Sequence, residues 1–132
     1  MIATRETDSQ DSTLRLPAVL VVEDEVLVRA EATEYLRNQG FRAIEAANAD
    51  EARQILSSGE RIEVLFSDIN MPGSMDGLAL AYWVRENHPW VEVILTSGDS
   101  RPDIKGKWDG ILIEKVYDIA AVALQIRLLL AI

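Results

Sequence analysis

The sequence has no cysteine and only one histidine, His88, among its 132 residues. The lack of cysteine excludes disulfide bonds, thiolate metal centres and a cysteine nucleophile, and it is compatible with a reducing compartment. Zinc is disfavoured as well, because its usual sulfur and nitrogen ligands are almost absent. His88 follows a predicted helix and precedes Pro89, so we interpret it as a surface histidine near the negative end of a helix dipole.

Long apolar runs and basic residues are also scarce. No stretch approaches the ~20 apolar residues needed to span a bilayer, and residues 1–15 lack the apolar core of a secretory signal. Lys and Arg number 13 against 22 Asp and Glu, which gives a net charge of −9. Because an acidic chain repels the phosphate backbone, direct nucleic-acid binding is not expected. We predict a cytoplasmic protein that contacts neither a membrane nor nucleic acid.

The remaining composition indicates one globular domain. Hydrophobic residues make up 48% of the chain, which is enough for one core at this length. Residues 1–16 mix polar side chains without periodicity, so we predict a flexible N-terminal tail there. The domain then covers residues 17–132.

Short apolar runs alternate with stretches of helical spacing along this domain. Such alternation predicts a doubly wound α/β fold, with a parallel sheet covered by helices on both faces. Residues 97–109 are rich in Gly, Pro, Asp and Lys, so the fourth helix is expected to be short or irregular. The predicted strands are 18–22, 41–45, 62–67, 91–95 and 111–113, and the predicted helices are 26–38, 49–56, 78–87 and 118–131.

Polar side chains follow four of the five predicted strands. In open parallel sheets, ligands bind beyond the carboxyl ends of the strands, so these residues are the candidates for a functional site. Singly, each has an ordinary explanation as a helix cap or a surface charge, but their common position favours a shared role. The groups are Glu23-Asp24-Glu25, Ser67-Asp68, Thr96-Ser97 and Glu114-Lys115.

The chemistry of these groups is consistent with Mg²⁺ and phosphoryl transfer. Clustered carboxylates raise one another's pKa, and a divalent cation with oxygen ligands removes that penalty. A carboxylate in this setting can attack phosphorus, provided that the charge of the transferred group is neutralised on several sides. Lys115 and Thr96 could each take one phosphoryl oxygen. The metal ligands would come from Glu23, Asp24, Asp68 and a backbone carbonyl near Asn70.

These residues resemble the motifs of response-regulator receiver domains, over about residues 17–131. The acidic-pair strand of that family resembles VLVVEDE at residues 19–25, and its phosphoacceptor loop resembles DINMPGSMDG at residues 68–77. Its switch-threonine strand resembles VILTSG at residues 93–98, and its lysine corresponds to Lys115. Single-domain receivers of alphaproteobacterial type look most similar, because the loop carries one residue more than the common form of this motif.

The resemblance implies a flavodoxin-like (βα)5 fold with sheet order 2-1-3-4-5. It implies that Asp68 accepts a phosphoryl group from a histidine kinase or phosphotransfer protein, and that Glu23 and Asp24 hold Mg²⁺, with Asp24 the direct ligand. Thr96 would bond the phosphoryl group and act as a switch, and Lys115 would pair with the phosphoryl group. Such a protein is a phosphoacceptor rather than an enzyme, with at most self-catalysed phosphorylation and dephosphorylation.

Two departures from the family pattern concern the relay of the signal. Val116 stands where the family has proline after the lysine, often in a cis bond. Because a cis bond before a non-proline residue costs ~2.5–4 kcal/mol, we predict a trans Lys115–Val116 bond and a displaced Lys115 ammonium. Leu112 stands at the position of the aromatic switch residue, so a readout by ring rotation cannot operate there.

The last predicted helix is apolar on nearly its whole circumference. One stripe, which includes Val122, Ala123 and Ile126, is expected to face the sheet. A helix that is apolar all round is usually buried on more than one side, so we predict a homodimer or partner contact through a second stripe. That stripe consists of Ala121, Leu124, Leu128 and Ala131.

Three functions remain open at this point. The first is a phosphoacceptor without an attached effector, acting as a stand-alone regulator or a phosphate sink, because the chain ends with its fifth helix. The second is a receiver-like interaction module that is never phosphorylated. The third is a phosphohydrolase of the haloacid-dehalogenase class, which is disfavoured because Asn70 replaces the second aspartate that would act as acid and base.

Overall fold

A computed structural model describes residues 15–98 and 106–132 of the chain. The predicted tail over residues 1–16 lies almost entirely outside the described residues. The predicted short or irregular fourth helix also falls largely outside them, because residues 99–105 are not described.

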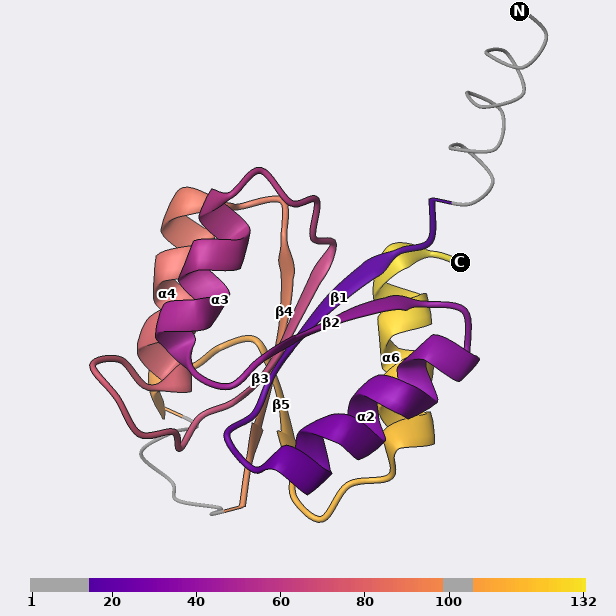
Figure 1. The fold of residues 1–132 in the computed structure, drawn as a ribbon. Helices are drawn as coiled ribbons and strands as arrows, with labels where there is room; N and C mark the ends of the chain where they lie inside the picture. Colours follow the sequence, from indigo (N-terminus) through magenta and orange to yellow (C-terminus); the bar gives the residue numbers. More distant parts are fainter. Residues whose placement is uncertain (1–14, 99–105) are drawn as a thin grey trace, which may run out of the picture.

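The centre of the fold is a five-stranded parallel sheet of order β2-β1-β3-β4-β5 (Figure 1). This confirms the predicted architecture and strand order. The ends of several strands extend beyond the apolar runs from which they were predicted, because backbone pairing continues through Asp68, Thr96 and Ser97. The strands are β1 (Ala18–Val22), β2 (Arg42–Ala46), β3 (Val64–Asp68), β4 (Glu92–Ser97) and β5 (Ile111–Glu114).

Helices cover both faces of the sheet (Figure 1). Helices α2 (Val26–Asn38) and α6 (Ile119–Leu130) lie on one face, and α3 (Ala49–Ser57) and α4 (Gly77–Asn87) lie on the other. Side-chain caps set the starts of three helices, because the oxygens of Asn48, Asp76 and Asp118 accept hydrogen bonds from backbone N–H groups in the first turn.

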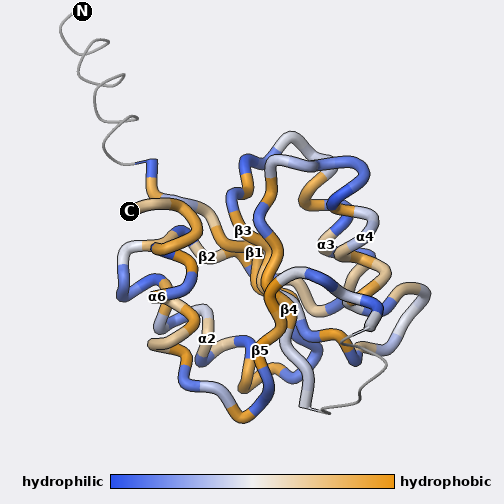
Figure 2. Tube along the Cα trace, turned by 180° about the vertical axis from the view of Figure 1, so that it is seen from behind, coloured by the Kyte–Doolittle hydropathy of each residue, from blue (hydrophilic) through white to orange (hydrophobic). Residues whose placement is uncertain are grey.

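Two apolar cores lie on the two sides of the sheet. The strands form the continuous hydrophobic centre of Figure 2, as expected for a sheet buried on both faces. Alternate residues of each strand enter opposite cores: Leu20 packs under α3 and α4, whereas Val21 packs under α2 and α6. The predicted inner stripe of α6 is confirmed, since Val122, Ala123 and Ile126 are buried in the second core.

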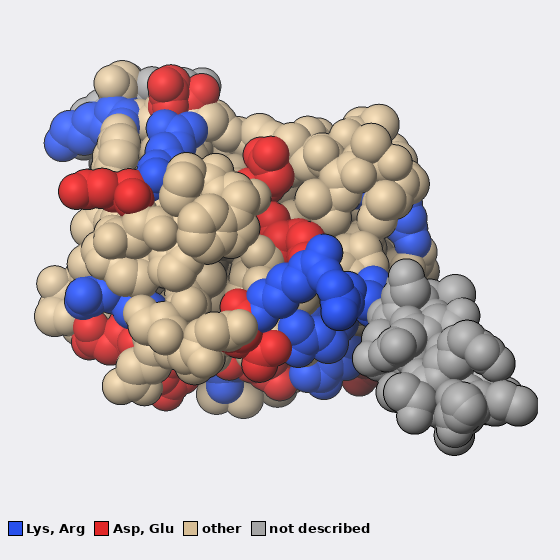
Figure 3. Space-filling view, turned by 90° about the horizontal axis from the view of Figure 1, so that it is seen from above, with Lys and Arg blue, Asp and Glu red and all other residues tan. Residues whose placement is uncertain are grey.

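The end of the domain at which the strands begin carries mixed charges. Figure 3 looks onto this end, where basic and acidic side chains lie next to one another. Two ion pairs belong to it, Arg42–Glu60 and Arg61–Glu63, with N···O distances of 3.0 and 2.7 Å. Within the described ranges, no helix has the length and apolar character that crossing a membrane requires.

Candidate functional site

The strand register brings the predicted polar residues to one edge of the sheet. Asp68 at the end of β3 pairs with Thr96 of β4, and Glu23 directly follows β1. Lys115 directly follows β5, where its backbone N–H donates to the Ser97 carbonyl at 2.8 Å. Because all strands are parallel, these positions share the carboxyl edge, where the α/β rule predicted the site.

Lys115 links the acidic residues of this edge. Its ammonium Nζ lies 3.0 Å from Oε1 of Glu23 and 3.2 Å from Oδ2 of Asp68. Both carboxylates are almost completely buried, with side chains 5% and 7% exposed. The ammonium is therefore positioned directly beside the predicted phosphoacceptor.

This position corrects two predictions. The Lys115–Val116 peptide bond is cis, not trans, and the ammonium is not displaced from the site. The predictions considered only the local preference of the peptide bond. The position of Lys115 is instead determined by contacts with residues distant in the sequence, which are the Glu23 and Asp68 carboxylates and the Ser97 carbonyl.

The residues predicted to hold a metal ion lie close together. Glu23, Asp24 and Asp68 each offer a carboxylate oxygen, and these oxygens lie within 4.8 Å of one another. Asp24 is exposed, whereas the other two are buried, so Asp24 presents the accessible carboxylate of the group. A set of three carboxylates suits Mg²⁺, which is bound by a few carboxylates and several waters. The donor set thus fits the predicted ion.

The electrostatics of the site favour a bound cation. Burial raises the pKa of the Glu23 and Asp68 carboxyls, and the opposing effect of the Lys115 ammonium does not cancel it. Burial lowers the pKa of the Lys115 ammonium, but its contacts with Glu23 and Asp68 outweigh this effect and leave the pKa raised. One ammonium therefore incompletely balances the buried carboxylates, and a divalent cation would complete the balance.

The Thr96 hydroxyl is the second polar group beside Asp68. Thr96 is only 2% exposed, and its Oγ1 atom has no hydrogen-bond partner among the described residues. A buried hydroxyl without a hydrogen-bond partner lowers the free energy of unfolding by about 1–3 kcal/mol. The structure therefore contains a buried donor next to Asp68 that an additional oxygen ligand at this site could satisfy.

The backbone around Asp68 depends on a glycine that the sequence reasoning did not assign a role. The N–H of Gly77 donates to the Ile69 carbonyl at 2.8 Å, which places the start of α4 against the end of β3. A Cβ atom on Gly77 would overlap the Asp68 carbonyl oxygen and would lie 2.8 Å from Cα of Ile69. The final glycine of the 68–77 motif was the available signal, and its reason is close backbone approach.

The 68–77 loop, which is one residue longer than the common form of the motif, makes an exposed turn at residues 72–74. Gly73 adopts a φ of 117°, which other residues rarely adopt, and the next residue, Ser74, bonds to both carboxylate oxygens of Asp50 at 2.9 and 3.0 Å. The loop is thus attached to the start of α3. The N–H of Asn70 donates to Oδ1 of Asp68 at 3.3 Å, so the beginning of the loop orients the carboxylate.

The remaining predicted residues lie away from the acidic edge. Leu112 is partly buried and packs into the core under α3 and α4. The predicted outer stripe of α6 is exposed at all of its four positions, and the side chains of Leu124 and Leu128 are 59% and 69% exposed. His88 caps the end of α4 and lies between the rings of Trp83 and Trp90.

The family of this chain follows from its sequence. The profile of the family described as "Response regulator receiver domain" matches residues 19–108. The chain therefore belongs to the response-regulator receiver family. The matched residues include Glu23, Asp24, Asp68 and Thr96, and Lys115 follows them.

Curated relatives are longer than this chain. The sensor kinase CckA of Brucella abortus is 38% identical over 81 residues, which are 61% of this chain and 8% of that protein. The aerobic respiration control protein ArcA of Escherichia coli is 34% identical over 90 residues, which are 68% of this chain and 37% of that protein. The chain thus matches well under half the length of these two relatives.

Solved structures share the fold over most of the chain. A response regulator receiver protein from Sinorhizobium medicae has a TM-score of 0.82 at 24% identity, covering 89% of this chain and 97% of that one. The response regulator TrrA from Thermotoga maritima, in complex with Mg²⁺–BeF, has a TM-score of 0.75 at 27% identity. That match covers 86% of this chain and 99% of the other.

Proposed function

We propose that this receiver domain accepts a phosphoryl group on Asp68 from a phosphohistidine of a histidine kinase or phosphotransfer protein, with Mg²⁺ as cofactor. The observation that carries the proposal is the contact of the Lys115 ammonium with both Asp68 and Glu23. In the reaction, a carboxylate oxygen of Asp68 bonds to phosphorus while the phosphorus–nitrogen bond breaks. The electron pair of that bond returns to the donor imidazole.

The neighbouring side chains have distinct roles in this step. The Lys115 ammonium pairs with one phosphoryl oxygen, and the Thr96 hydroxyl, which has no partner among the described residues, donates to another. Bound Mg²⁺ supplies the remaining positive charge. Its ligands would be the carboxylates of Glu23, Asp24 and Asp68 and the backbone carbonyl near Asn70. The Mg²⁺–BeF complex of TrrA supports this choice of ion.

The surface around the acidic edge suits the docking of a protein donor. Val26 and Leu27 at the start of α2 are exposed, and Val116 next to Lys115 is fully exposed. Exposed large apolar residues beside a functional site are typical of protein contacts. A kinase or phosphotransfer protein that covered them would bring its phosphohistidine to Asp68.

The consequence of phosphorylation is regulatory in this proposal. The protein acts on no external substrate and is not an enzyme in that sense, and the acyl phosphate is lost by hydrolysis. It operates in the cytoplasm as a stand-alone regulator or as a phosphate sink that drains a kinase. Ala121, Leu124, Leu128 and Ala131 provide an exposed surface for a homodimer or another partner.

A second function is a receiver-like interaction module that is never phosphorylated. The presence of Leu112 favours this second function, because leucine lacks the aromatic ring whose rotation would signal phosphorylation at this position. The complete set of acidic, hydroxyl and ammonium groups at the sheet edge opposes it, since an interaction module has no need of them.

The decisive experiment is incubation with Mg²⁺ and acetyl phosphate, followed by measurement of the intact mass. We expect the gain of one phosphoryl group in the wild type and in Asp109→Asn, whose carboxylate is exposed and pairs with Arg85. We expect no gain in Asp68→Ala. Absence of a gain in the wild type, with acetyl phosphate and with the cognate kinase, would favour the interaction module.

A further inference from the structure

Arg29 connects the first part of α2 with the loop that carries the acidic pair. Its Nη1 atom donates to the backbone carbonyl of Glu23 at 2.8 Å, and its Nε atom donates to Oε1 of Glu45 on β2 at 3.1 Å. The arginine side chain is only 16% exposed. Because the guanidinium is planar and rigid, the pairing of Nε with Glu45 also fixes the direction of Nη1. Glu45 therefore helps to aim the N–H group that holds the Glu23 carbonyl.

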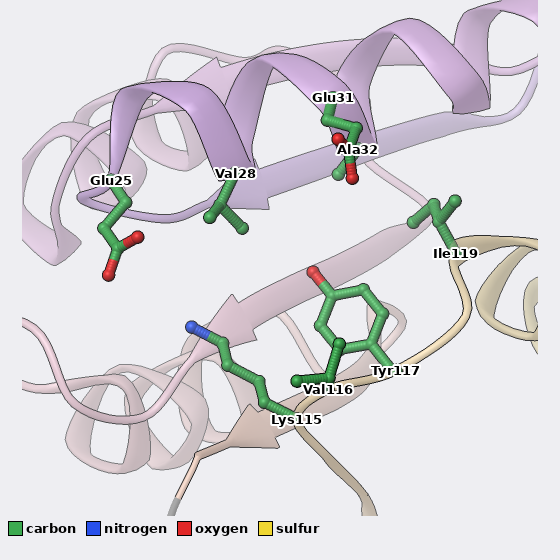
Figure 4. Close-up of a pocket in the computed structure, with 8 residues that line it drawn as sticks. All are labelled: Glu25, Val28, Glu31, Ala32, Lys115, Val116, Tyr117 and Ile119. Atoms are coloured by element: carbon green, nitrogen blue, oxygen red, sulfur yellow. The ribbon is translucent and has the colours of Figure 1, made fainter.

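The first turns of α2 have little support from packing. The helix begins at Val26, but its first buried residue is Ala32. A pocket of about 250 Å³ lies beside these turns. Figure 4 shows that Glu25 and Val28 face this pocket from α2, whereas Lys115 lies on its other side. Burial of apolar side chains therefore contributes little to the position of the beginning of this helix.

The start of α2 also differs from the starts of α3, α4 and α6 in its capping. Side-chain oxygens cap those three helices, whereas the N-cap residue of α2, Glu25, makes no such hydrogen bond with the described residues. Long side chains of a helix point toward its N-terminus, and Arg29 follows this rule in reaching the Glu23 carbonyl. Arg29 thus provides a connection between helix and loop that a cap provides elsewhere.

The carbonyl that Arg29 holds belongs to the peptide bond between Glu23 and Asp24. Because a peptide bond is planar, fixing its oxygen also fixes the plane from which the Asp24 backbone continues. The N–H of Glu23 is held as well, since it donates to the Ala46 carbonyl of β2 at 3.1 Å. The loop thus places a carboxylate oxygen of Asp24 within 4.8 Å of one of Asp68.

Asp24 depends on this backbone more than the other two carboxylates do. Lys115 contacts the carboxylates of both Glu23 and Asp68, and Oε2 of Glu23 also accepts from the Glu25 N–H at 3.1 Å. Asp24 is exposed and is not a partner of Lys115. The direction of its carboxylate therefore follows mainly from the backbone of the loop.

We propose that Arg29 is a positioning residue of the Mg²⁺ site: it orients Asp24 through the Glu23 carbonyl, and Glu45 in turn orients Arg29. This inference rests on the proposed binding of Mg²⁺ to the acidic edge. Arg29 contacts neither the ion nor the phosphoryl group and acts only through the loop. Replacement of residues that orient the ligands of a metal ion typically weakens metal binding about 10–100-fold.

The test measures the affinity for Mg²⁺ by competition with Mn²⁺, which prefers the same oxygen ligands and whose free ion is detected by electron paramagnetic resonance. In Arg29→Met we expect the dissociation constant of Mg²⁺ to rise at least about tenfold. Arg29→Lys should lose affinity as well, because an ammonium keeps the charge but lacks the rigid fork. Glu45→Leu should give a smaller rise, since the Glu23 carbonyl keeps its donor but the donor loses its orienting partner.

Arg42 provides the matched control at the opposite end of the sheet. Its Nη2 atom donates to the Glu60 carboxylate at 3.0 Å and to the Arg61 carbonyl at 3.1 Å, which are the same kinds of acceptor that Arg29 has. Arg42→Met should therefore leave the affinity for Mg²⁺ unchanged. Urea unfolding in a chelator checks that each variant is folded. If Arg29→Met does not fold, Arg29→Lys and Glu45→Leu decide.

A second measurement separates positioning from a purely structural role. The rate of phosphorylation by acetyl phosphate is measured over a range of Mg²⁺ concentrations. In Arg29→Met the concentration that gives half of the maximal rate should rise together with the dissociation constant. The maximal rate should remain close to that of the wild type, because saturating Mg²⁺ restores the arrangement of the ligands. A lower maximal rate with an unchanged half-saturating concentration would overturn the inference.

The wild type distinguishes the two kinds of failure. If the wild type binds Mg²⁺ and Arg29→Met binds it equally well, this inference alone is contradicted. A wild type that binds no Mg²⁺ contradicts the proposed cofactor and this inference with it.

Discussion

The ammonium of Lys115 lies 3.2 Å from Oδ2 of Asp68, although 47 positions separate the two residues in the sequence. The contact joins the end of β3 to the residue after β5, across the intervening β4. It places a permanent positive charge beside a buried carboxylate, and the same ammonium contacts Glu23. The stability and the chemistry of the acidic edge both depend on this arrangement.

Replacement of Lys115 by Met should destabilise the protein. The variant leaves the Asp68 and Glu23 carboxylates buried without their cationic partner, and an unsatisfied buried group costs about 1–3 kcal/mol. Urea unfolding at neutral pH without Mg²⁺ measures the change. Lys107→Met is the matched control, because Lys107 is exposed. Equal stability of the two variants would contradict the assigned role of the ammonium.

Replacement of Asp68 by Asn should stabilise the Mg²⁺-free protein at neutral pH. Burial raises the pKa of the Asp68 carboxyl in the folded state, so the native protein holds its proton more tightly than the unfolded chain. The contribution of Asp68 to the stability of the wild type must then fall as the pH rises through the carboxyl range, whereas the amide of Asn has no such dependence. Thermal unfolding from about pH 4 to about pH 8 in a chelator measures this. The difference in stability between Asp68→Asn and the wild type should become smaller as the pH is lowered. A difference that increases at acid pH would contradict a raised pKa of Asp68.

Mg²⁺ should raise the stability of the wild type. A ligand that binds only the folded state adds about 2.7 kcal/mol at a concentration of one hundred times its dissociation constant. The effect should be largely lost in Asp24→Asn, because this variant removes the accessible carboxylate of the cluster. Asp118→Asn is the control, since Asp118 caps α6 and is not one of the three clustered carboxylates. Both results are obtained by measuring the melting temperature at increasing Mg²⁺ concentrations. An equal rise of the melting temperature in Asp24→Asn and in the wild type would exclude Asp24 as a ligand.

Replacement of Gly77 by Ala should displace the backbone of Asp68. The new methyl group overlaps the Asp68 carbonyl, and overpacking of this kind costs about 1–3 kcal/mol or more. Phosphorylation by acetyl phosphate should slow at the same time, because the acceptor moves. Gly106→Ala is the control, since a Cβ there meets no described residue within 4 Å. Indistinguishable unfolding and phosphorylation of the two variants would show that Gly77 has no such role.

The outer stripe of α6 should mediate self-association. Leu124 and Leu128 are exposed, and the only charged side chain of the helix, Arg127, donates to the Gln39 carbonyl at 2.6 Å. Sedimentation should show a dimer whose dissociation constant rises at least about tenfold, or about 1.4 kcal/mol, in Leu128→Glu. Leu27→Glu, at an exposed apolar position of α2, should not change it. A monomeric wild type at high concentration, phosphorylated or not, would refute this contact.

The sequence was sufficient to predict the sheet and the group of residues at its edge. Apolar runs alternating with helical spacing indicate crossover connections, and the parallel arrangement then brings Asp68, Thr96 and Lys115 together without any knowledge of distances. The position of Lys115 was nevertheless predicted wrongly. The local preference of the bond before Val116 was considered, but the attraction of two distant carboxylates was not.

Gly77 and Tyr117 show which properties escape sequence reasoning. The requirement for a glycine at position 77 arises because α4 begins against the backbone of β3, and that approach depends on tertiary packing. Tyr117 lies in the connection between β5 and α6, and its position beside Thr96 in the wall of one small cavity depends on how that connection packs against the sheet. Neither relationship has a periodic signature along the chain.

The most direct test of the central claim is identification of the phosphorylated residue. The protein is phosphorylated with acetyl phosphate and Mg²⁺, reduced with borohydride, digested and sequenced by mass spectrometry. Reduction of an aspartyl phosphate converts the aspartate to homoserine. We expect homoserine at position 68 and unmodified residues at Glu23 and Asp24. Homoserine at another position, or none in protein that has gained a phosphoryl group, would contradict this expectation.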